Sequence, residues 1–330
     1  MQAARYRDDG IGIDAIDPGP LRAGWVRVRV QACGICGTDL HAWADPKRAP
    51  RCIPGHEIVG IPADGPAGTP DRLCAIHPRV ACGACAFCKS GARHLCSRGE
   101  LIGITRHGGW AEQVDCPREN LVAVPATLEP VEAALTEPFA VALRGLARAR
   151  IAASSRVLVV GAGSVGLITA LLARDRVARV AVSARYPAQH AAAERLGVVA
   201  LSSEIFESAV AELQPDVVIE TVGGNADTLT TAIRACRPGG RVVVLGVFDG
   251  QAMIDARTLV LHELELIASN TYASDARGCE FESAVEWLVR HRSELATLCT
   301  HQFPLAAVAD ALRCAADKTA GSIKVSLIVG

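Results

Sequence analysis

The stretch that decides the fold reads VLVVGAGSVG and spans residues 157–166. A short apolar, β-branched run enters a glycine-rich turn, which leads into the helix-like run Leu167–Arg174. A second apolar strand, Arg179–Val182, follows. Strand, glycine turn, helix and strand in this order are typical of a βαβ unit that binds a dinucleotide.

The three glycines of this turn have different physical roles. Gly161 permits a tight turn, Gly163 lets the backbone approach a pyrophosphate, and Gly166 lets helix and strand pack closely. Ser164 and Val165 open the helix, whose unpaired N–H groups and positive dipole end favour phosphate. We therefore predict that these five residues bind a nucleotide cofactor.

The regions on either side of this unit differ in character. From Arg156 onward, strands alternate with helices such as 187–196 and 227–236, which predicts a doubly wound parallel sheet. Residues 1 to about 120 are β-rich and turn-rich, and 130–150 is helical in two pieces with a break near Pro138. The tail 321–329 returns to a strand pattern, and we expect it to rejoin the first region. The whole is of the α/β class.

Composition sets the class of protein. A chain of 330 residues, half of them hydrophobic, favours two domains with sizeable cores. The formal net charge is −1, without long runs of one sign, so no nucleic-acid or membrane partner is indicated. The N-terminal segment lacks an apolar signal-like run, and we expect a cytoplasmic protein. The 13 cysteines are then expected to be thiols and metal ligands rather than disulfides.

Four of the cysteines form a Cys-x2-Cys-x2-Cys-x7-Cys array: Cys82, Cys85, Cys88 and Cys96. Four thiolates within fifteen residues suit a closed tetrahedral zinc site, which would be structural because no position is left for substrate. An iron–sulfur cluster also takes four cysteines and is the alternative.

A second group of metal-binding residue types precedes this array, in CGICGTDLH (33–41) and PGHEIVG (54–60). Together with the array, GGWAE (108–112), EPFAV (137–141) and the glycine turn, these segments resemble the zinc-dependent medium-chain alcohol dehydrogenases over nearly the whole chain. The resemblance is nearest to their polyol, sorbitol and threonine dehydrogenase branch. It implies a GroES-like catalytic domain (1–150, completed by about 290–330) and a Rossmann domain (151–289).

The resemblance also implies a catalytic zinc site. Cys36 and His56 would be ligands, Glu57 a ligand or near-ligand, and Glu137 stands where other branches carry a cysteine ligand. A thiolate, an imidazole and a carboxylate would leave a fourth position for the substrate oxygen. Glu137 could instead be a favourable carboxylate near a helix N-terminus. Two zinc ions per chain are expected.

Thr38 and His41 match the proton relay of that family. An imidazole titrates near neutral pH and suits general acid–base transfer. The simpler interpretation makes Thr38 a helix cap and His41 a surface residue, and Asp39 could also cap the helix.

We predict an enzyme that transfers a hydride between a secondary alcohol (a polyol, sugar or amino alcohol) and a nicotinamide cofactor. One rival is a zinc-free quinone or enoyl reductase on the same fold, which would lack the set of Cys36, His56 and Glu57. Another is a regulatory protein that binds nucleotide or zinc without turnover. The segment 264–272 resembles subunit contacts of the family, so a homo-dimer or homo-tetramer is expected.

The identity of the cofactor depends on the end of the second Rossmann strand. NAD-dependent enzymes place an acidic residue there to bind the ribose hydroxyls. Here the positions hold Ser183 and Ala184, and Arg185 follows. We therefore predict NADP, with its 2′-phosphate bound by Ser183 and Arg185. The alternative is that Arg185 stacks on adenine or faces solvent and the enzyme uses NAD.

Overall fold

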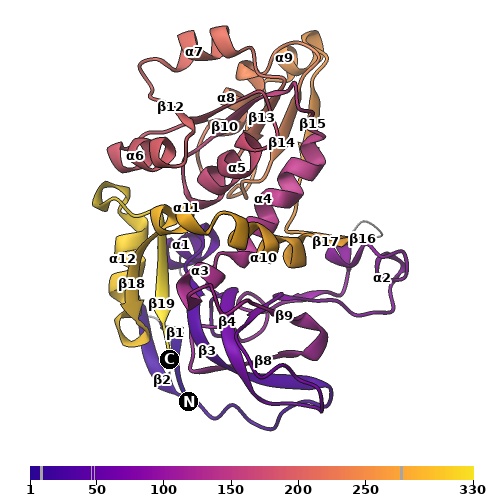
Figure 1. The fold of residues 1–330 in the computed structure, drawn as a ribbon, viewed down its shortest axis with the longest axis vertical. Helices are drawn as coiled ribbons and strands as arrows, with labels where there is room; N and C mark the ends of the chain where they lie inside the picture. The colour runs from indigo at the N-terminus through magenta and orange to yellow at the C-terminus, as the bar shows by residue number, and fades with distance from the viewer. Residues whose placement is uncertain (8–9, 46, 48, 276–277) are drawn as a thin grey trace. The chain divides into compact units, whose positions relative to one another are not determined.

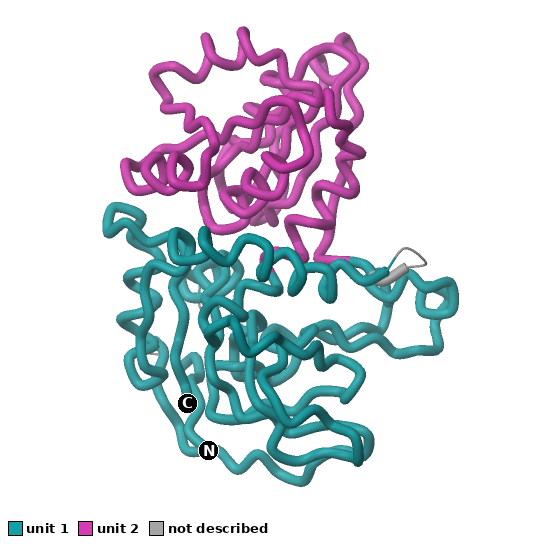
Figure 2. The backbone as a smooth tube through the Cα atoms, in the orientation of Figure 1, with its two compact units in different colours: residues 1–137, 273–330 teal, residues 138–272 magenta. Residues whose placement is uncertain are grey.

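The computed structural model describes residues 1–7, 10–45, 47, 49–275 and 278–330. The chain forms two compact units, which Figure 2 shows in different colours. Unit 1 comprises Met1–Glu137 and Ala273–Gly330, and unit 2 comprises Pro138–Tyr272. Unit 1 is therefore built from both ends of the chain.

Unit 2 is built on one parallel sheet of six strands, in the order β12-β11-β10-β13-β14-β15 (Figure 1). The strands are β10 Arg156–Val160, β11 Arg179–Ser183, β12 Val199–Leu201, β13 Val217–Glu220, β14 Arg241–Val244 and β15 Glu265–Ala268. The helices are α4 Thr136–Ala149, α5 Ser164–Arg174, α6 Pro187–Arg195, α7 Phe206–Leu213, α8 Thr228–Ala235 and α9 Ala256–Leu261. The predicted doubly wound sheet is confirmed.

The core of unit 2 explains the apolar strands. Leu158, Val160 and Val218 are buried on one face of the sheet, in a cluster with side chains of α7, α8 and α9. Val157 and Val159 alternate with them and are also fully buried, and α5 contacts β10 and β11. A parallel sheet covered on both faces requires such continuous apolar runs.

Unit 1 contains an open sheet in the order β18-β19-β3-β4-β5-β9, with β8 also paired to β3. Its strands are β3 Trp25–Gly34, β4 Glu57–Asp64, β5 Cys74–Ile76, β8 Gln113–Pro117, β9 Leu121–Ala123, β18 Cys299–Pro304 and β19 Lys324–Ile328. Three short antiparallel pairs complete the strands: β1 Gln2–Arg7 with β2 Gly10–Ala15, β6 Arg79–Val80 with β7 Glu100–Leu101, and β16 Ser274–Asp275 with β17 Gly278–Cys279. The C-terminal strand β19 pairs with β3, which joins the two ends of the chain.

The α-helices of unit 1 are α1 Gly37–Ala44, α2 Ala86–Lys89, α3 Pro130–Ala133, α10 Glu280–Arg290, α11 Arg292–Leu298 and α12 Val308–Ala316. The 3₁₀ turns are η2 Arg93–Leu95, η3 Arg118–Asn120, η4 Leu305–Ala307 and η5 Lys318–Ala320. Along β3, Val26, Val28 and Val30 are fully buried, as the alternation in the sequence predicts. Within the described residues, no helix is long and apolar enough to cross a membrane.

Two details differ from the expectations. The helical break falls between α3 and α4, at residues 134–135, and Pro138 lies in the first turn of α4 rather than at the break. Proline is tolerated there because the first N–H groups of a helix have no intrahelical partner. The sequence analysis also missed β12, an edge strand of only three residues.

Candidate functional site

The first metal-ligand group lies where β3, α1 and β4 meet. Cys36 precedes α1, and His56 precedes β4, whose first residue is Glu57. Gly34 near the end of β3 pairs with Glu57 across the antiparallel ladder, which brings the two segments together. One ligand atom from each of Cys36, His56 and Glu57 lies within 4.8 Å of the others. These three predicted residues therefore form one cluster.

The position of Cys36 is set by its own helix. The Asp39 carboxylate accepts a hydrogen bond of 2.8 Å from the Cys36 backbone N–H, as a capping residue does. Asp39 is buried, and burial raises the pKa of its carboxyl. The Tyr6 hydroxyl donates to the Asp39 carbonyl at 3.1 Å. Two hydrogen bonds therefore fix the backbone that carries the Cys36 thiol. One joins the Cys36 N–H to the Asp39 carboxylate, and the other joins the Asp39 carbonyl to Tyr6.

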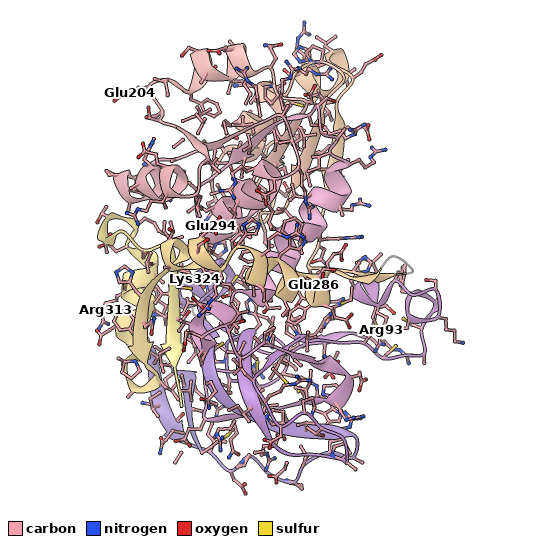
Figure 3. The ribbon with its side chains drawn as sticks, in the orientation of Figure 1. Arg93, Glu204, Glu286, Glu294, Arg313 and Lys324 are labelled. Atoms are coloured by element: carbon pink, nitrogen blue, oxygen red, sulfur yellow. The ribbon has the colours of Figure 1, made fainter. Side chains whose placement is uncertain are left out.

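Glu57 has a partner that the sequence analysis missed. The Lys324 Nζ lies 2.7 and 2.8 Å from the two carboxylate oxygens of Glu57, and 3.1 Å from the Ile35 carbonyl. Figure 3 labels Lys324 on β19. Both side chains are 2 % exposed. A lysine inside the apolar strand 323–328 was a usable signal, because a buried ammonium requires a buried counter-charge.

The chemistry of this cluster fits a divalent cation. The His56 Nδ1 is buried and has no hydrogen-bond partner among the described residues. Burial lowers the pKa of His56, but the charges of Cys36, Asp39 and Glu137 and a hydrogen bond to Cys36 outweigh it and raise the pKa well above its usual value. The surroundings therefore favour positive charge at this point. Buried acidic groups whose charge Lys324 does not neutralise cost folding free energy, and a bound cation would remove this cost.

Glu137 lies at the start of α4. Among the described residues, it does not belong to the group of Cys36, His56 and Glu57, whose ligand atoms all lie within 4.8 Å of one another. Its side chain is buried, so it is not a solvent-facing helix carboxylate. Its pKa is raised to about 7, mainly by burial and also by the charge of Glu57, while the charge of His56 opposes the rise. Glu137 therefore belongs to the electrostatic surroundings of the cluster.

The two predicted relay residues both lie on α1. The Thr38 hydroxyl is exposed and 3.8 Å from the Cys36 Sγ. His41 is half-buried one turn further along the same helix. Residues three apart on a helix share a face.

The cysteine array forms a second group of ligand atoms. The Cys85 Sγ lies 3.5 Å from the Cys88 Sγ and 3.7 Å from the Cys96 Sγ. The Sγ atoms of Cys82 and Cys88 are 3.9 Å apart. A tetrahedron with Zn–S bonds of about 2.3 Å has sulfurs roughly 3.8 Å apart. Backbone N–H groups of Ala84 and Cys85 lower the pKa of the Cys82 thiol to about 5. Burial and hydrogen bonds to Cys85 and Cys96 raise the pKa of the Cys88 thiol to about 11. The array therefore has the sulfur spacing of an all-cysteine zinc site, with Cys82 as its most acidic thiol.

The glycine turn has the geometry expected of a phosphate site. Gly161 has φ +102, and a Cβ on Gly166 would lie 1.8 Å from the Gly161 carbonyl oxygen. A Cβ on Gly163 would meet nothing within 4 Å, so this glycine leaves open space before α5. No side chain caps α5, whose first residues are Ser164 and Val165. Its first N–H groups are available to a ligand.

The residues predicted to select the cofactor lie at the end of β11, whose last residue is Ser183, and just after it. The Ser183 Oγ accepts a hydrogen bond of 2.9 Å from the Gly161 N–H, and its hydroxyl hydrogen can still donate. Arg185 is exposed, with its guanidinium carbon 5.7 Å from the centre of the Tyr186 ring. Its backbone N–H binds the Gln189 side chain at 3.0 Å. The exposed guanidinium is thus free of a carboxylate partner among the described residues.

Two segments of the chain match families of known proteins. Residues 22–126 match the alcohol dehydrogenase GroES-like domain, and 164–290 match the zinc-binding dehydrogenase family. L-galactonate-5-dehydrogenase of Escherichia coli K12 is 30% identical over 86% of this chain and 85% of its own length. The chain belongs to the zinc-dependent medium-chain alcohol dehydrogenases.

Two solved structures resemble the dehydrogenase over its whole length. A zinc-binding dehydrogenase from Sinorhizobium meliloti 1021, bound to NADP, has a TM-score of 0.88 and 29% identity, and covers 99% of this chain and 98% of its own. An alcohol dehydrogenase from Escherichia coli CFT073, complexed with NADH, has a TM-score of 0.89 and 25% identity, and 99% of each chain is covered. The dehydrogenase is an oxidoreductase of the zinc type, and the zinc-free rival is not supported.

Four side chains of types that can line a substrate pocket, Trp43, Trp110, Phe139 and Asn270, differ in their exposure. Trp110 and Phe139 are fully buried core residues of the dehydrogenase, and Asn270 is exposed. Trp43 is half-buried at the end of α1 and lines a cavity.

Proposed function

We propose that the dehydrogenase catalyses reversible hydride transfer between a secondary hydroxyl of a polyol, sugar alcohol or amino alcohol and NADP. The observation that carries this is the buried cluster of Cys36, His56 and Glu57, with its unpartnered imidazole nitrogen. A spectrophotometric screen of such alcohols with NADP and NAD tests it. Turnover of none of them, in protein that carries zinc, contradicts it.

Each side chain of the cluster has a distinct task in this proposal. Cys36 and His56 hold the catalytic zinc, Glu57 completes or supports the set, and Glu137 is the alternative carboxylate. Lys324 neutralises Glu57 and limits how far its carboxylate can move. When bound, zinc supplies Lewis acidity that polarises the substrate oxygen. A second zinc in the array of Cys82, Cys85, Cys88 and Cys96 is structural, so we expect two zinc ions per chain.

Thr38 and His41 carry the proton of the alcohol toward solvent. In His41→Ala we expect alcohol oxidation to slow most near neutral pH, because a positioned acid–base group contributes about 10²–10⁴-fold and the outer end of a relay less. Added imidazole buffer should restore part of the rate. Thr38→Ala is the matched control, since the inner hydroxyl should not be replaceable by buffer. An unchanged rate of His41→Ala at every pH contradicts the assignment.

Preference for NADP rests on Ser183 and Arg185, with no carboxylate at either position or at Ala184. In Arg185→Ala we expect kcat/KM for NADP to fall about 10- to 150-fold relative to NAD, the value of a hydrogen bond to a charged group. Arg195→Ala, an exposed arginine at the end of α6, is the control. A wild-type preference for NAD, or an unchanged ratio in the variant, shows that this site is misassigned.

We propose a cytoplasmic homo-dimer or homo-tetramer, in which unit 1 is the catalytic domain and unit 2 binds the cofactor. Among the described residues, the edge strand β15 pairs with β14 alone. Leu266 on β15 is exposed, as are Val260 and Leu261 of α9. Leu264 and Tyr272, at the ends of the predicted contact segment, are already buried within one chain. We expect sedimentation to give at least twice the chain mass at micromolar concentration, and a single-chain mass to refute this.

A further inference from the structure

Glu220 of unit 2 is a carboxylate with no exposed surface. It is the last residue of β13, and in the parallel sheet it pairs with Val160, the last residue of β10 (Figure 1). The carboxyl ends of parallel strands meet at one edge of a sheet, where nucleotides bind. The strand β13 therefore ends beside the turn that starts at Gly161.

One oxygen of the Glu220 carboxylate holds the loop after β13. Its Oε1 accepts hydrogen bonds from the Val222 N–H at 2.8 Å, the Gly223 N–H at 3.0 Å and the Thr228 hydroxyl at 2.7 Å. Thr228 is the first residue of α8. The other oxygen, Oε2, is buried and has no hydrogen-bond partner among the described residues. The carboxylate therefore joins the strand, the loop that follows it and the next helix.

The conformation of this loop requires such a fixed point. Gly223 and Gly224 have φ angles of +63 and +60, in the left-handed region. A Cβ on Gly223 would lie 2.5 Å from the Val247 carbonyl oxygen, and the Gly224 N–H donates to this oxygen at 2.8 Å. Two consecutive glycines lose much conformational freedom on folding. The hydrogen bonds to Glu220 oppose this loss.

The same loop contacts the glycine turn directly. The Thr221 Oγ1 lies 2.9 Å from the Val160 carbonyl oxygen and 3.1 Å from the Gly161 carbonyl oxygen, and its hydroxyl can donate to either. A Cβ on Gly161 would lie 2.4 Å from the Val222 Cγ2, and a Cβ on Gly166 would lie 2.8 Å from the Thr221 Oγ1. The turn is therefore packed against the two residues that follow Glu220.

We propose that Glu220 is a positioning residue for the cofactor, because it fixes Thr221 and Val222 and thereby preforms the glycine turn for a pyrophosphate. The buried carboxylate does not itself touch the ligand. A turn that is already ordered need not lose conformational freedom when the ligand binds, so its affinity is higher. A charged acceptor binds backbone N–H groups more strongly than a neutral amide does. The proposal rests on the proposed binding of the cofactor at the glycine turn.

Glu220→Gln keeps the shape of the side chain and removes its charge. We expect the dissociation constant of NADPH, measured by its fluorescence with the zinc-loaded protein, to rise about tenfold, as the weakening of hydrogen bonds to a charged group allows. The dissociation constant of NADH should rise by the same factor, because both cofactors contain the pyrophosphate. This separates the effect from that of Arg185→Ala, which should change the ratio of the two. With an alcohol that the screen shows to be turned over, KM for the cofactor should rise while kcat changes less than about twofold.

Asp216→Asn is the matched control. Asp216 directly precedes β13, at the opposite end of the same strand, and its carboxylate accepts the Arg156 N–H at 2.8 Å. Both variants remove a carboxylate that holds backbone, so both should lower the thermal unfolding midpoint, but only Glu220→Gln should weaken the binding of NADPH and NADH. Without cofactor, the amide of Gly161 should exchange hydrogen faster in Glu220→Gln than in Asp216→Asn.

Thr221→Val removes the hydroxyl that contacts the turn, and it decides the question if Glu220→Gln does not fold. We expect it to raise both dissociation constants about two- to tenfold, the value of a hydrogen bond between neutral groups. Unchanged dissociation constants in folded Glu220→Gln or in Thr221→Val, a change confined to one cofactor, or an equal loss in Asp216→Asn overturns this proposal and leaves the dehydrogenase function standing. Wild-type protein that binds neither NADPH nor NADH overturns the proposed function and this proposal with it.

Discussion

Cys36→Ser is expected to lower kcat/KM for alcohol oxidation by about 10³-fold or more. The hydroxyl of serine does not ionise at neutral pH, so the cluster loses the thiolate that binds a soft metal. Lewis-acid catalysis contributes several kcal/mol, and each 1.36 kcal/mol corresponds to a factor of ten in rate. The fold should be retained, because Cys36 is only half-buried and α1 keeps the hydrogen bond between Asp39 and its N-terminus.

The measurement is kcat/KM together with elemental zinc and the thermal unfolding midpoint. We expect zinc to fall from two ions per chain to one while the unfolding midpoint changes little. Cys314→Ser, a half-buried thiol of α12 outside both clusters, should keep both zinc ions and full activity. An active Cys36→Ser enzyme, or one zinc or fewer in fully active wild type, would contradict the assignment of the cluster.

Cys85→Ser should instead destabilise the protein. The segment 82–96 has almost no apolar core, since α2 and η2 bury no side chain and both Phe87 and Leu95 are 45% exposed. The short antiparallel pair of β6 and β7 closes its base. Structural zinc contributes about 10–16 kcal/mol to the folding of small zinc-finger peptides, so losing one of four ligands should cost several kcal/mol here.

Hydrogen exchange and thermal unfolding should detect this change. We expect the amides of 82–100 to lose protection first and the unfolding midpoint to fall, whereas Cys36→Ser should show neither effect. A chelator that removes both metals should reproduce the two phenotypes together. A Cys85→Ser protein with wild-type protection across the segment and unaltered zinc content would falsify the structural role.

The cluster of Cys36, His56 and Glu57 shows how much of the candidate site could be predicted from the sequence. Cys36, His56 and Glu57 were predicted by resemblance, and the structure brings their ligand atoms together. The same reasoning placed Glu137 beside them, but it lies outside that group and contributes charge and burial. Whether Glu57 or Glu137 reaches a metal depends on distances of a few ångströms between β4 and α4, which residue identity does not encode.

What the sequence by itself determined are the features that lie within short segments. The glycine turn, the spacing of the four cysteines and the capping of α1 by Asp39 each fall within about fifteen residues, where local geometry leaves few arrangements. Only the tertiary structure decided the rest. The pair of Glu57 and Lys324 joins residues 267 positions apart. The cavity that Trp43 lines is also lined by Arg5 of β1 and by Arg51 of the loop after α1. Such contacts arise from the sheet pairing of β19, β3 and β4 and from packing, and neither has a local signal in the chain.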